Sequence, residues 1–302
     1  MNTVDIVIPV YNDNPYLVRI LTSIFNQPLP KGWKVRVYVV DDGSEKPVVL
    51  PNIDFEMTLI KLPVNKGRSS ACNAGVQAGV SGLVYIVDVD CVLEKKNVLS
   101  SHINVILDKG ADISCGHIYS NGDNFWSRYQ NNVVKRRTVA FKKGDKASHT
   151  TANLMLKRKV FETIGGFDES YGQYGFEDKD LLLRLVQQGY RTQSNEDTAI
   201  EHNPELSLRV IGNKMEMAGR HGSQLFKSRH AEYYKKGKFH LFDLSDRWFN
   251  HIAPLVLKPF LIMLIIGFDF FEKRNMMPYY LGSTVVKFVS GFSYALGTCR
   301  AK

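Results

Sequence analysis

The chain has few cysteines, and their spacing fits neither a metal site nor a disulfide framework. Its 302 residues include only Cys72, Cys91, Cys115 and Cys299, with no C-x-x-C pair among them. Closely spaced thiols are typical of zinc sites, and dense cysteine frameworks are typical of small secreted domains. We therefore expect reduced thiols in a cytosolic protein.

Signals for secretion and for membrane crossing are absent or broken. No basic segment followed by an apolar stretch stands at the N-terminus, so we expect no signal peptide. The mostly apolar region 252–271 is interrupted by Pro254, Lys258 and Pro259. Its unbroken part, 259–268, is half the length of about 20 residues that a spanning helix needs. The region is expected to form a buried helix or one that lies in a membrane interface.

The bulk composition is that of a globular protein with an uneven charge. Hydrophobic residues make up 44% and charged residues 23%, which permits a substantial core in one large α/β domain with an appendage, or in two small domains. Residues 1–202 hold 24 Lys and Arg against 23 Asp and Glu, whereas residues 203–302 hold 15 against 7. A basic final third indicates an anionic partner: membrane lipid, a phosphate-bearing acceptor or nucleic acid.

Strand and helix patterns alternate along the first hundred residues, which favours a mostly parallel sheet with helices on its faces. Weak patterning follows over 113–151, and then further elements are expected. In parallel sheets, ligands bind beyond the carboxyl ends of the strands. The predicted strands are 4–10, 35–40, 57–62, 83–87 and 152–156, and the predicted helices are 14–25, 68–78, 97–110, 159–164 and 177–188.

Two carboxylates one residue apart, Asp88 and Asp90, end an apolar strand. Carboxylate oxygens there could hold Mg²⁺ or Mn²⁺ against a diphosphate, although a solvated turn would have the same sequence. Asp42 also follows a strand and could accept hydrogen bonds from a base or a ribose, but the Asp-Gly pair that it begins is also common in β-turns.

Further polar groups lie near predicted helix ends. Lys66 and Arg68 precede or begin a helix of small residues, where an anion such as diphosphate could bind, or where the chain simply caps the helix. Glu177 and Asp178 begin another helix, so they could serve as a general base for an acceptor hydroxyl or only complement the helix dipole. His202 alone would more often make a structural hydrogen bond.

Taken in order, these segments resemble the family 2 glycosyltransferases, which have the nucleotide-sugar-binding GT-A fold. The resemblance spans residues 4 to about 204. It rests on Val-Ile-Pro-Val-Tyr-Asn at 7–12, Val-Val-Asp-Asp-Gly-Ser at 39–44, Asn-Lys-Gly at 65–67 with Asn-Ala-Gly at 73–75, Asp-Val-Asp at 88–90, Gly-Gly-Phe-Asp-Glu at 165–169 and Gly-Phe-Glu-Asp at 175–178.

The resemblance implies a GT-A domain over 1–204, with a nucleotide-binding half at 1–110 and an acceptor-binding half at 111–204, followed by a basic, partly apolar helical extension at 205–302. It also implies a set of donor contacts. These are Pro9, Tyr11 and Asp42 on the nucleoside, and Lys66, Gly67 and Arg68 near the nucleotide or its phosphates.

The resemblance implies catalytic and metal-binding roles as well. Asp90 is the main ligand of Mn²⁺ or Mg²⁺, Asp88 lies near the ribose or the metal, and His202 matches a third ligand of some related enzymes. Asp178 is the catalytic base, with Glu177 beside it.

This chain departs from the family pattern at two places. Cys72 stands where many relatives have Arg before the Asn of the third motif, which puts the diphosphate contact in doubt. The Gln-x-x-Arg-Trp motif and the clear transmembrane helices of processive synthases are absent, which favours the addition of single sugars.

We therefore predict an inverting, metal-dependent glycosyltransferase of the bacterial surface-polysaccharide type. Its donor is a nucleotide sugar, by resemblance a UDP-sugar, and its acceptor is a glycan or a lipid-linked molecule. The basic tail predicts that the protein is cytoplasmic and is held peripherally on the anionic inner face of the membrane. The alternative is that the helices of the tail simply pack on the catalytic domain. The alternatives are a non-catalytic nucleotide-sugar-binding or membrane-surface protein. No aromatic–basic motif favours nucleic acid.

Overall fold

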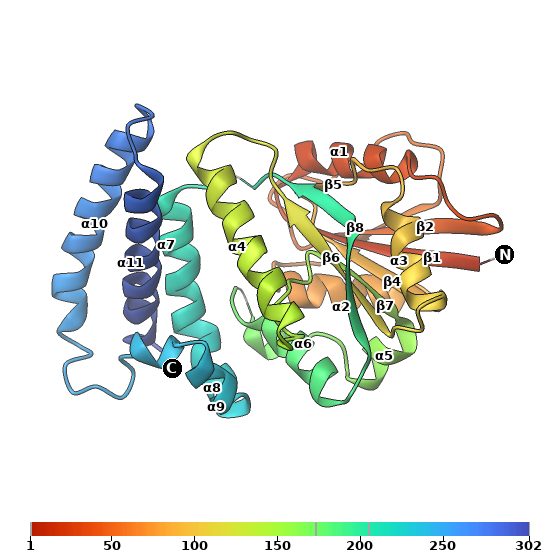
Figure 1. The fold of residues 1–302 in the computed structure, drawn as a ribbon. Coiled ribbons are helices and arrows are strands. Elements are labelled where there is room, and N and C mark those ends of the chain that lie inside the picture. Colours follow the sequence, from red (N-terminus) through yellow and green to blue (C-terminus); the bar gives the residue numbers. More distant parts are fainter. Residues whose placement is uncertain (1, 173, 205, 302) are drawn as a thin grey trace. The chain divides into compact units, whose positions relative to one another are not determined.

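The computed structural model describes residues 2–172, 174–204 and 206–301. These residues form two compact units that alternate along the chain (Figure 1). The first unit holds the residues up to Asn121, together with Gln130–Glu169 and Leu181–Pro204. The second holds Gly122–Tyr129, Ser170–Asp180 and the described residues after Pro204.

A mixed sheet is the centre of the first unit (Figure 1). Among the described residues it has eight strands, in the order β3-β2-β1-β4-β7-β6-β8-β5. Strands β3, β2, β1 and β4 run parallel, β7 is antiparallel to both β4 and β6, and β8 is parallel to β6 and antiparallel to β5. The bounds are β1 Asn2–Val10, β2 Trp33–Asp41, β3 Met57–Lys61, β4 Leu83–Val87, β5 Cys91–Val92, β6 Ile113–Tyr119, β7 Asn153–Lys157 and β8 Thr192–His202.

Helices cover both faces of this sheet, as the alternating side chains of β1 require. Ile6 and Ile8 belong to the buried core that also contains Leu17 and Ile20 of α1. On the opposite face of β1, Val7 lies directly under Gly75 of α2, where a β-carbon would approach it to 2.5 Å. The helices are α1 Asn14–Phe25, α2 Arg68–Ala78, α3 Val98–Leu107, α4 Phe125–Lys142, α5 Arg158–Thr163, the short 3₁₀ helix η1 Glu169–Tyr171 and α6 Glu177–Gln187.

The α/β prediction is confirmed, with two omissions. The region expected to be weakly patterned, 113–151, contains the strand β6 and the 18-residue helix α4. Strand β8 was not predicted, although it lies between β6 and β5 in the sheet. A β-bulge between Gly116 and Ile118 and a polar strand sequence hide the period-two pattern in both strands.

The second unit is helical. Its elements are α7 Leu208–Met217, the π-helix η2 Ala218–Gly222, α8 Ser223–Arg229, α9 Ala231–Lys236, the 3₁₀ helix η3 Phe239–Leu241, α10 Ala253–Glu272 and α11 Tyr279–Thr298. Leu208, Leu261, Val286 and Val289 contribute to one apolar core that joins α7, α10 and α11.

Helix α10 corrects the expectation of an interrupted segment. Pro254 lies in its first turn, where no hydrogen bond is lost, and Pro259 lies inside the helix without ending it. Across the described ranges, α10 alone is long and apolar enough to cross a membrane by length and composition, with a mean hydropathy of 1.9.

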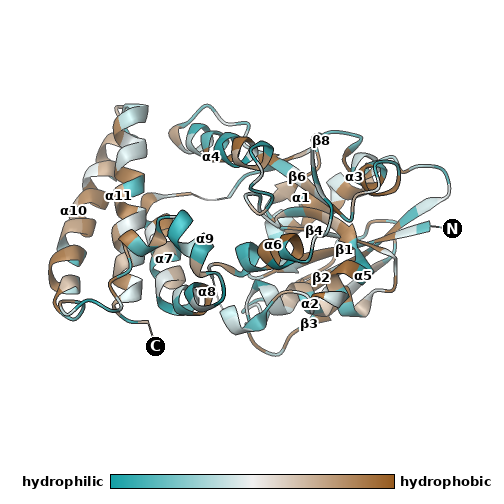
Figure 2. Ribbon diagram, turned by 60° about the horizontal axis from the view of Figure 1, so that its bottom comes forward, coloured by the Kyte–Doolittle hydropathy of each residue, from teal (hydrophilic) through white to brown (hydrophobic). Residues whose placement is uncertain are grey.

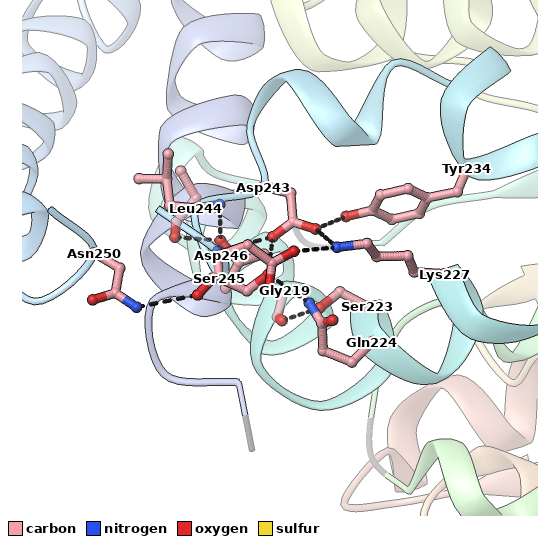
Figure 3. A network of polar contacts seen from close by, with 12 residues as sticks. Gly219, Ser223, Gln224, Lys227, Tyr234, Asp243, Leu244, Ser245, Asp246 and Asn250 are labelled. Atoms are coloured by element: carbon pink, nitrogen blue, oxygen red, sulfur yellow. Dashed lines mark hydrogen bonds and ion pairs between the residues drawn. The ribbon is translucent and has the colours of Figure 1, made fainter. Parts of the chain in front are cut away.

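A polar network fastens the chain before α10 to the rest of the second unit (Figure 3). The carboxylate of Asp243 accepts hydrogen bonds from the Tyr234 hydroxyl at 2.9 Å and from Lys227 Nζ at 3.2 Å. Tyr234 also contacts the hydroxyl of Tyr294 in α11 at 2.8 Å. Burial acts to raise the pKa of Asp243, but hydrogen bonds from Ser245, Tyr234 and Lys227 outweigh it and lower the pKa.

Candidate functional site

The carboxyl ends of β1, β2 and β4 meet at one edge of the sheet in the first unit. Val10 pairs with Asp41, and Val7 pairs with Ile86, so the residues that follow these strands come together. They border a cavity of about 200 Å³. Six predicted site residues are among those that line it: Pro9, Tyr11, Asp42, Arg68, Asp88 and Asp90.

Asp42 is fixed by the loop before α2. Its two carboxylate oxygens accept hydrogen bonds from the backbone N–H groups of Lys66 and Gly67, at 2.8 and 2.9 Å. Burial raises the pKa of Asp42, although those two hydrogen bonds act to lower it. Gly43 permits the close approach, because it has a φ of +72° and a β-carbon there would lie 2.5 Å from the backbone of Val64. Lys66 and Gly67 therefore orient Asp42 through their main chain.

Arg68 and Asp88 form an ion pair at the same edge. Arg68 Nη2 and Nε lie 2.6 and 2.8 Å from Asp88 Oδ1. The guanidinium also donates to Oγ1 of Thr151 at 2.9 Å and lies 5.5 Å from the centre of the Phe167 ring. Asp88 thus faces α2, whereas Asp90, two residues later, faces β8.

Asp90 lies against His202. The short antiparallel pairing of β5 with β8 sets Cys91 opposite His202, and it brings His202 Nε2 to 3.3 Å from Asp90 Oδ2. On the other side of the ring, Gln130 Nε2 lies 2.7 Å from His202 Nδ1 and donates to the His202 carbonyl at 3.0 Å. Gln130 therefore holds the imidazole with Nε2 toward Asp90, the kind of outer contact that orients metal-binding histidines.

The donor atoms of this cluster fit a divalent cation. The ligand atoms of Asp90, Cys91 and His202 lie within 4.8 Å of one another. A carboxylate suits Mg²⁺ or Mn²⁺, and imidazole is a common ligand of first-row metals. Burial raises the pKa of Cys91, whose sulfur lies 3.9 Å from the Ala152 carbonyl oxygen, so its neutral thiol is the poorest ligand of the three.

The motif at 73–75 makes structural contacts that the sequence did not reveal. Asn73 of α2 both accepts from the N–H of Phe167 and donates to its carbonyl, at 3.0 and 2.9 Å. Glu169 accepts hydrogen bonds from Ser70 and Asn73. Gly166, with a φ of +68°, lies so close to Asn73 that a β-carbon would approach Oδ1 to 2.7 Å. The motifs at 73–75 and 165–169 therefore clamp each other.

Glu177 and Asp178 belong to the second unit, in the first turn of α6. Glu177 is buried, and its carboxylate accepts the N–H of Gly175 at 2.7 Å. Asp178 is half-buried. Gly175 and Phe176 have φ values of +114° and +74°, and a non-glycine residue at such an angle is a strained feature found mostly where a fixed conformation is required.

The same turn of α6 is anchored by Asp180. This fully buried carboxylate lies 2.9 Å from Nε2 of His230 and accepts the Tyr171 hydroxyl at 3.2 Å. Both partners belong to the second unit. Sequence reasoning did not identify Gln130, Thr151 or His230, because a single polar residue in a helix or loop carries no spacing signal.

Comparison with known proteins places these motifs in a family. A model of glycosyl transferase family 2 matches residues 5–165, more than half of the chain. The chain belongs to glycosyl transferase family 2. A model described as the N-terminal domain of galactosyltransferase matches residues 136–204.

Curated relatives match about two thirds of the chain. It is 28% identical over 218 residues to the pre-mycofactocin glycosyltransferase of Mycobacterium tuberculosis, which covers 68% of this chain and 44% of that one. It is 34% identical over 233 residues to an N-acetylglucosaminyltransferase of Bradyrhizobium diazoefficiens, covering 68% and 47%. The chain spans about half the length of the curated relatives that it matches.

Solved structures confirm the GT-A fold of the chain. The mannosyltransferase PcManGT from Pyrobaculum calidifontis, in complex with GDP-Man and Mn²⁺, superposes with a TM-score of 0.61 at 19% identity, covering 96% of this chain and 85% of that one. Residues 1–349 of TarS from S. aureus superpose with a TM-score of 0.52 at 15% identity, covering 95% and 90%.

Proposed function

We propose that this protein is an inverting, metal-dependent glycosyltransferase that moves one sugar from a nucleotide diphosphate, UDP by family resemblance, to an acceptor hydroxyl. The acceptor is a glycan or a lipid-linked molecule of capsule, O-antigen or related polysaccharide synthesis. The observation that carries the proposal is the Asp90–His202 pair at the edge of the cavity in which Asp42 is fixed.

The donor contacts follow from the chemistry of that cavity. Asp42 presents a carboxylate held by two backbone N–H groups, and it can accept a hydrogen bond from a base N–H. The ring of Tyr11, 41% exposed, offers a face on which the nucleoside can pack. Pro9 lines the same cavity. Residues 1–110 are thus proposed as the donor-binding half of the 1–204 catalytic domain, and 111–204 as the acceptor-binding half.

Asp90 and His202 are the residues proposed to hold Mn²⁺ or Mg²⁺. A divalent cation bound there would neutralise the charge that develops on the departing nucleotide diphosphate. PcManGT was solved with Mn²⁺, which supports this choice of metal class. Asp88 is proposed to lie near the ribose or the metal, and its charge is balanced by Arg68.

Asp178 is proposed as the base. It takes the proton of the acceptor hydroxyl while that oxygen forms a bond to the anomeric carbon and the bond to the diphosphate breaks, with the diphosphate leaving with the electron pair. Glu177 supports it by fixing the preceding backbone at Gly175. Attack opposite the leaving group inverts the anomeric centre.

A decisive experiment compares Asp178→Asn with the exposed control Asp54→Asn. UDP-sugars and GDP-sugars are screened for hydrolysis and transfer, with Mn²⁺ and with EDTA. We expect Asp178→Asn to lose transfer by about a hundredfold or more while donor binding is kept, since general-base catalysis contributes about 10²–10⁴-fold. Normal turnover by that variant would contradict the base assignment, and activity in EDTA would contradict the metal.

The alternative is a non-catalytic nucleotide-sugar-binding or membrane-surface protein. Such a protein needs Asp42 and Asp90 but has no use for a base. Donor binding without any hydrolysis or transfer across the whole donor panel would favour it.

We further propose that the protein is located in the cytoplasm, at the inner face of the membrane, and that it has no nucleic-acid partner. A salt-sensitive gel shift with nucleic acid would contradict the second proposal.

A further inference from the structure

Large apolar side chains are exposed along one face of α10. Leu255 is 73% exposed, Ile262 57%, Met263 61% and Ile266 61%. Only 11% of its most apolar 18-residue window is buried. Contiguous exposed apolar surface of this kind marks an interaction site, because a solitary soluble helix would present charged residues there.

The opposite face of α10 is used for packing inside the second unit. Leu261 and Phe268 are buried in the core with residues of α7 and α11, and Leu257 and Ile265 pack against the same core. Helix α11 lies between α10 and α7 in Figure 1. The end of α11 is tied to the polar network through the contact of Tyr294 with Tyr234. Because α10 packs by one face on α11, which is itself fixed in the second unit, its opposite face is left exposed along the length of the helix.

The ends of α10 carry the groups that anchor helices at a bilayer surface. Arg247 and Trp248, which is 81% exposed, precede the helix, and Lys273 and Arg274 follow it, directly after the last turn, which contains Asp269 and Glu272. Tyr280, 88% exposed, comes shortly afterwards. Between Pro259 and Phe268 no residue is charged. In Figure 2, α10 is coloured mostly brown, the colour of hydrophobic residues. Aromatic and basic residues at both ends of an apolar helix are typical of attachment to an interface.

We propose that α10 docks on an anionic lipid bilayer, with Leu255, Ile262 and Ile266 in the acyl region and Arg247, Lys273 and Arg274 among the headgroups of a bilayer that attracts the net positive charge of residues 203–302. Lys258, on the exposed side, can extend its ammonium group to the phosphates. A second copy of the chain is the less favourable occupant, because residues 203–302 carry 15 basic against 7 acidic residues and would repel their own kind. This inference is independent of sugar transfer.

The test is flotation of the full chain with vesicles of phosphatidylcholine alone or with 30% phosphatidylglycerol. Ile262→Glu/Ile266→Glu is compared with Val49→Glu/Val80→Glu, which adds the same charges at exposed apolar positions of the first unit, 70% and 76% exposed. We expect the α10 variant to lose at least about tenfold in partitioning, since each lost side chain forfeits apolar burial and adds repulsion. The control variant should lose less than half of its binding.

Equal flotation of the two double variants would overturn the proposal. Equal binding to both vesicle types would also overturn it, because anionic lipid would then not be the partner. So would a dimer, detected by light scattering, that the charges introduced in α10 convert to a monomer while neither form floats with vesicles. Nucleotide binding, measured without lipid, should be unchanged in the α10 variant. Conversely, Asp178→Asn should still float, so failure of the membrane proposal and failure of the transfer proposal are distinguishable.

Discussion

Replacing Asp88 and Asp90 separately should divide two roles that the sequence presents as one motif. Asp88 is 28% exposed at its side chain and is held by Arg68 through contacts of 2.6 and 2.8 Å. Asp88→Asn leaves a neutral partner for Arg68, which keeps its hydrogen bond to Thr151. The lost charge at this partly exposed pair is worth about 1–2 kcal/mol of unfolding free energy. The first unit should melt about 2–8 °C lower.

Asp90→Asn should instead act on the cation. Even an outer contact of a metal ligand is worth about 10–100-fold in metal affinity, so loss of the carboxylate that faces His202 should cost more than about a hundredfold. Asp88→Asn should cost less than about tenfold. Titration of Mn²⁺ by electron paramagnetic resonance, with and without UDP, measures both, and Asp54→Asn serves as the surface control. Equal losses in the two variants would show that Asp88 ligates the metal directly and would refute the division.

Two further outcomes follow from single residues. Gly43→Ala should destabilise the first unit by about 3 kcal/mol and weaken nucleotide binding, because its β-carbon would lie 2.5 Å from the Val64 backbone. Gly32 has a similar φ of +82° but lies in open space. The control Gly32→Ala should therefore cost only about 1 kcal/mol in urea unfolding. The pKa of Asp243 is lowered in the folded state, so its stabilising contribution is present above its unfolded pKa and is lost as pH falls through the folded one. Asp243→Asn should lower the melting temperature at pH 7 and show a shallower decline toward pH 3; an unchanged acid limb would contradict this.

Sequence patterns predicted the fold of residues 1–110 well because its signals are local. β1, β2 and β4 are buried, β-branched strands, and each is followed at once by a polar group whose position the parallel register then fixes. Asp42 and Asp90 could be assigned to one edge for that reason. The contact of Asp42 with the N–H groups of Lys66 and Gly67 could not be predicted. It depends on the path of the loop before α2, whose backbone approaches Gly43 too closely for any β-carbon.

In the other half of the sheet, β7 was predicted, but β6 and β8 were not. β6 pairs with β7 and β8, and the latter lies about 80 residues later, so neither strand needs a clear pattern of its own. The polar residue Asn153 shows the reason. It is fully buried in β7 and donates to the carbonyl groups of both His117 and Thr198, so a single side chain bridges β6 and β8. A buried amide of this kind is visible only once its partners are placed.

The two carboxylates of the Asp-Val-Asp motif contact different partners. Two carboxylates one residue apart suggest a joint metal site, but the chain turns between them: the N–H of Cys91 returns to the carbonyl of Asp88 at 3.1 Å, and the N–H of Asn203 reaches the carbonyl of Asp90 at 3.2 Å. Asp88 is thereby turned to Arg68 and Asp90 to His202. The role of each carboxylate is therefore better indicated by the side chain that it contacts than by the carboxylate next to it in the sequence. Asp90 and His202, more than a hundred positions apart, are therefore the pair on which the metal proposal rests.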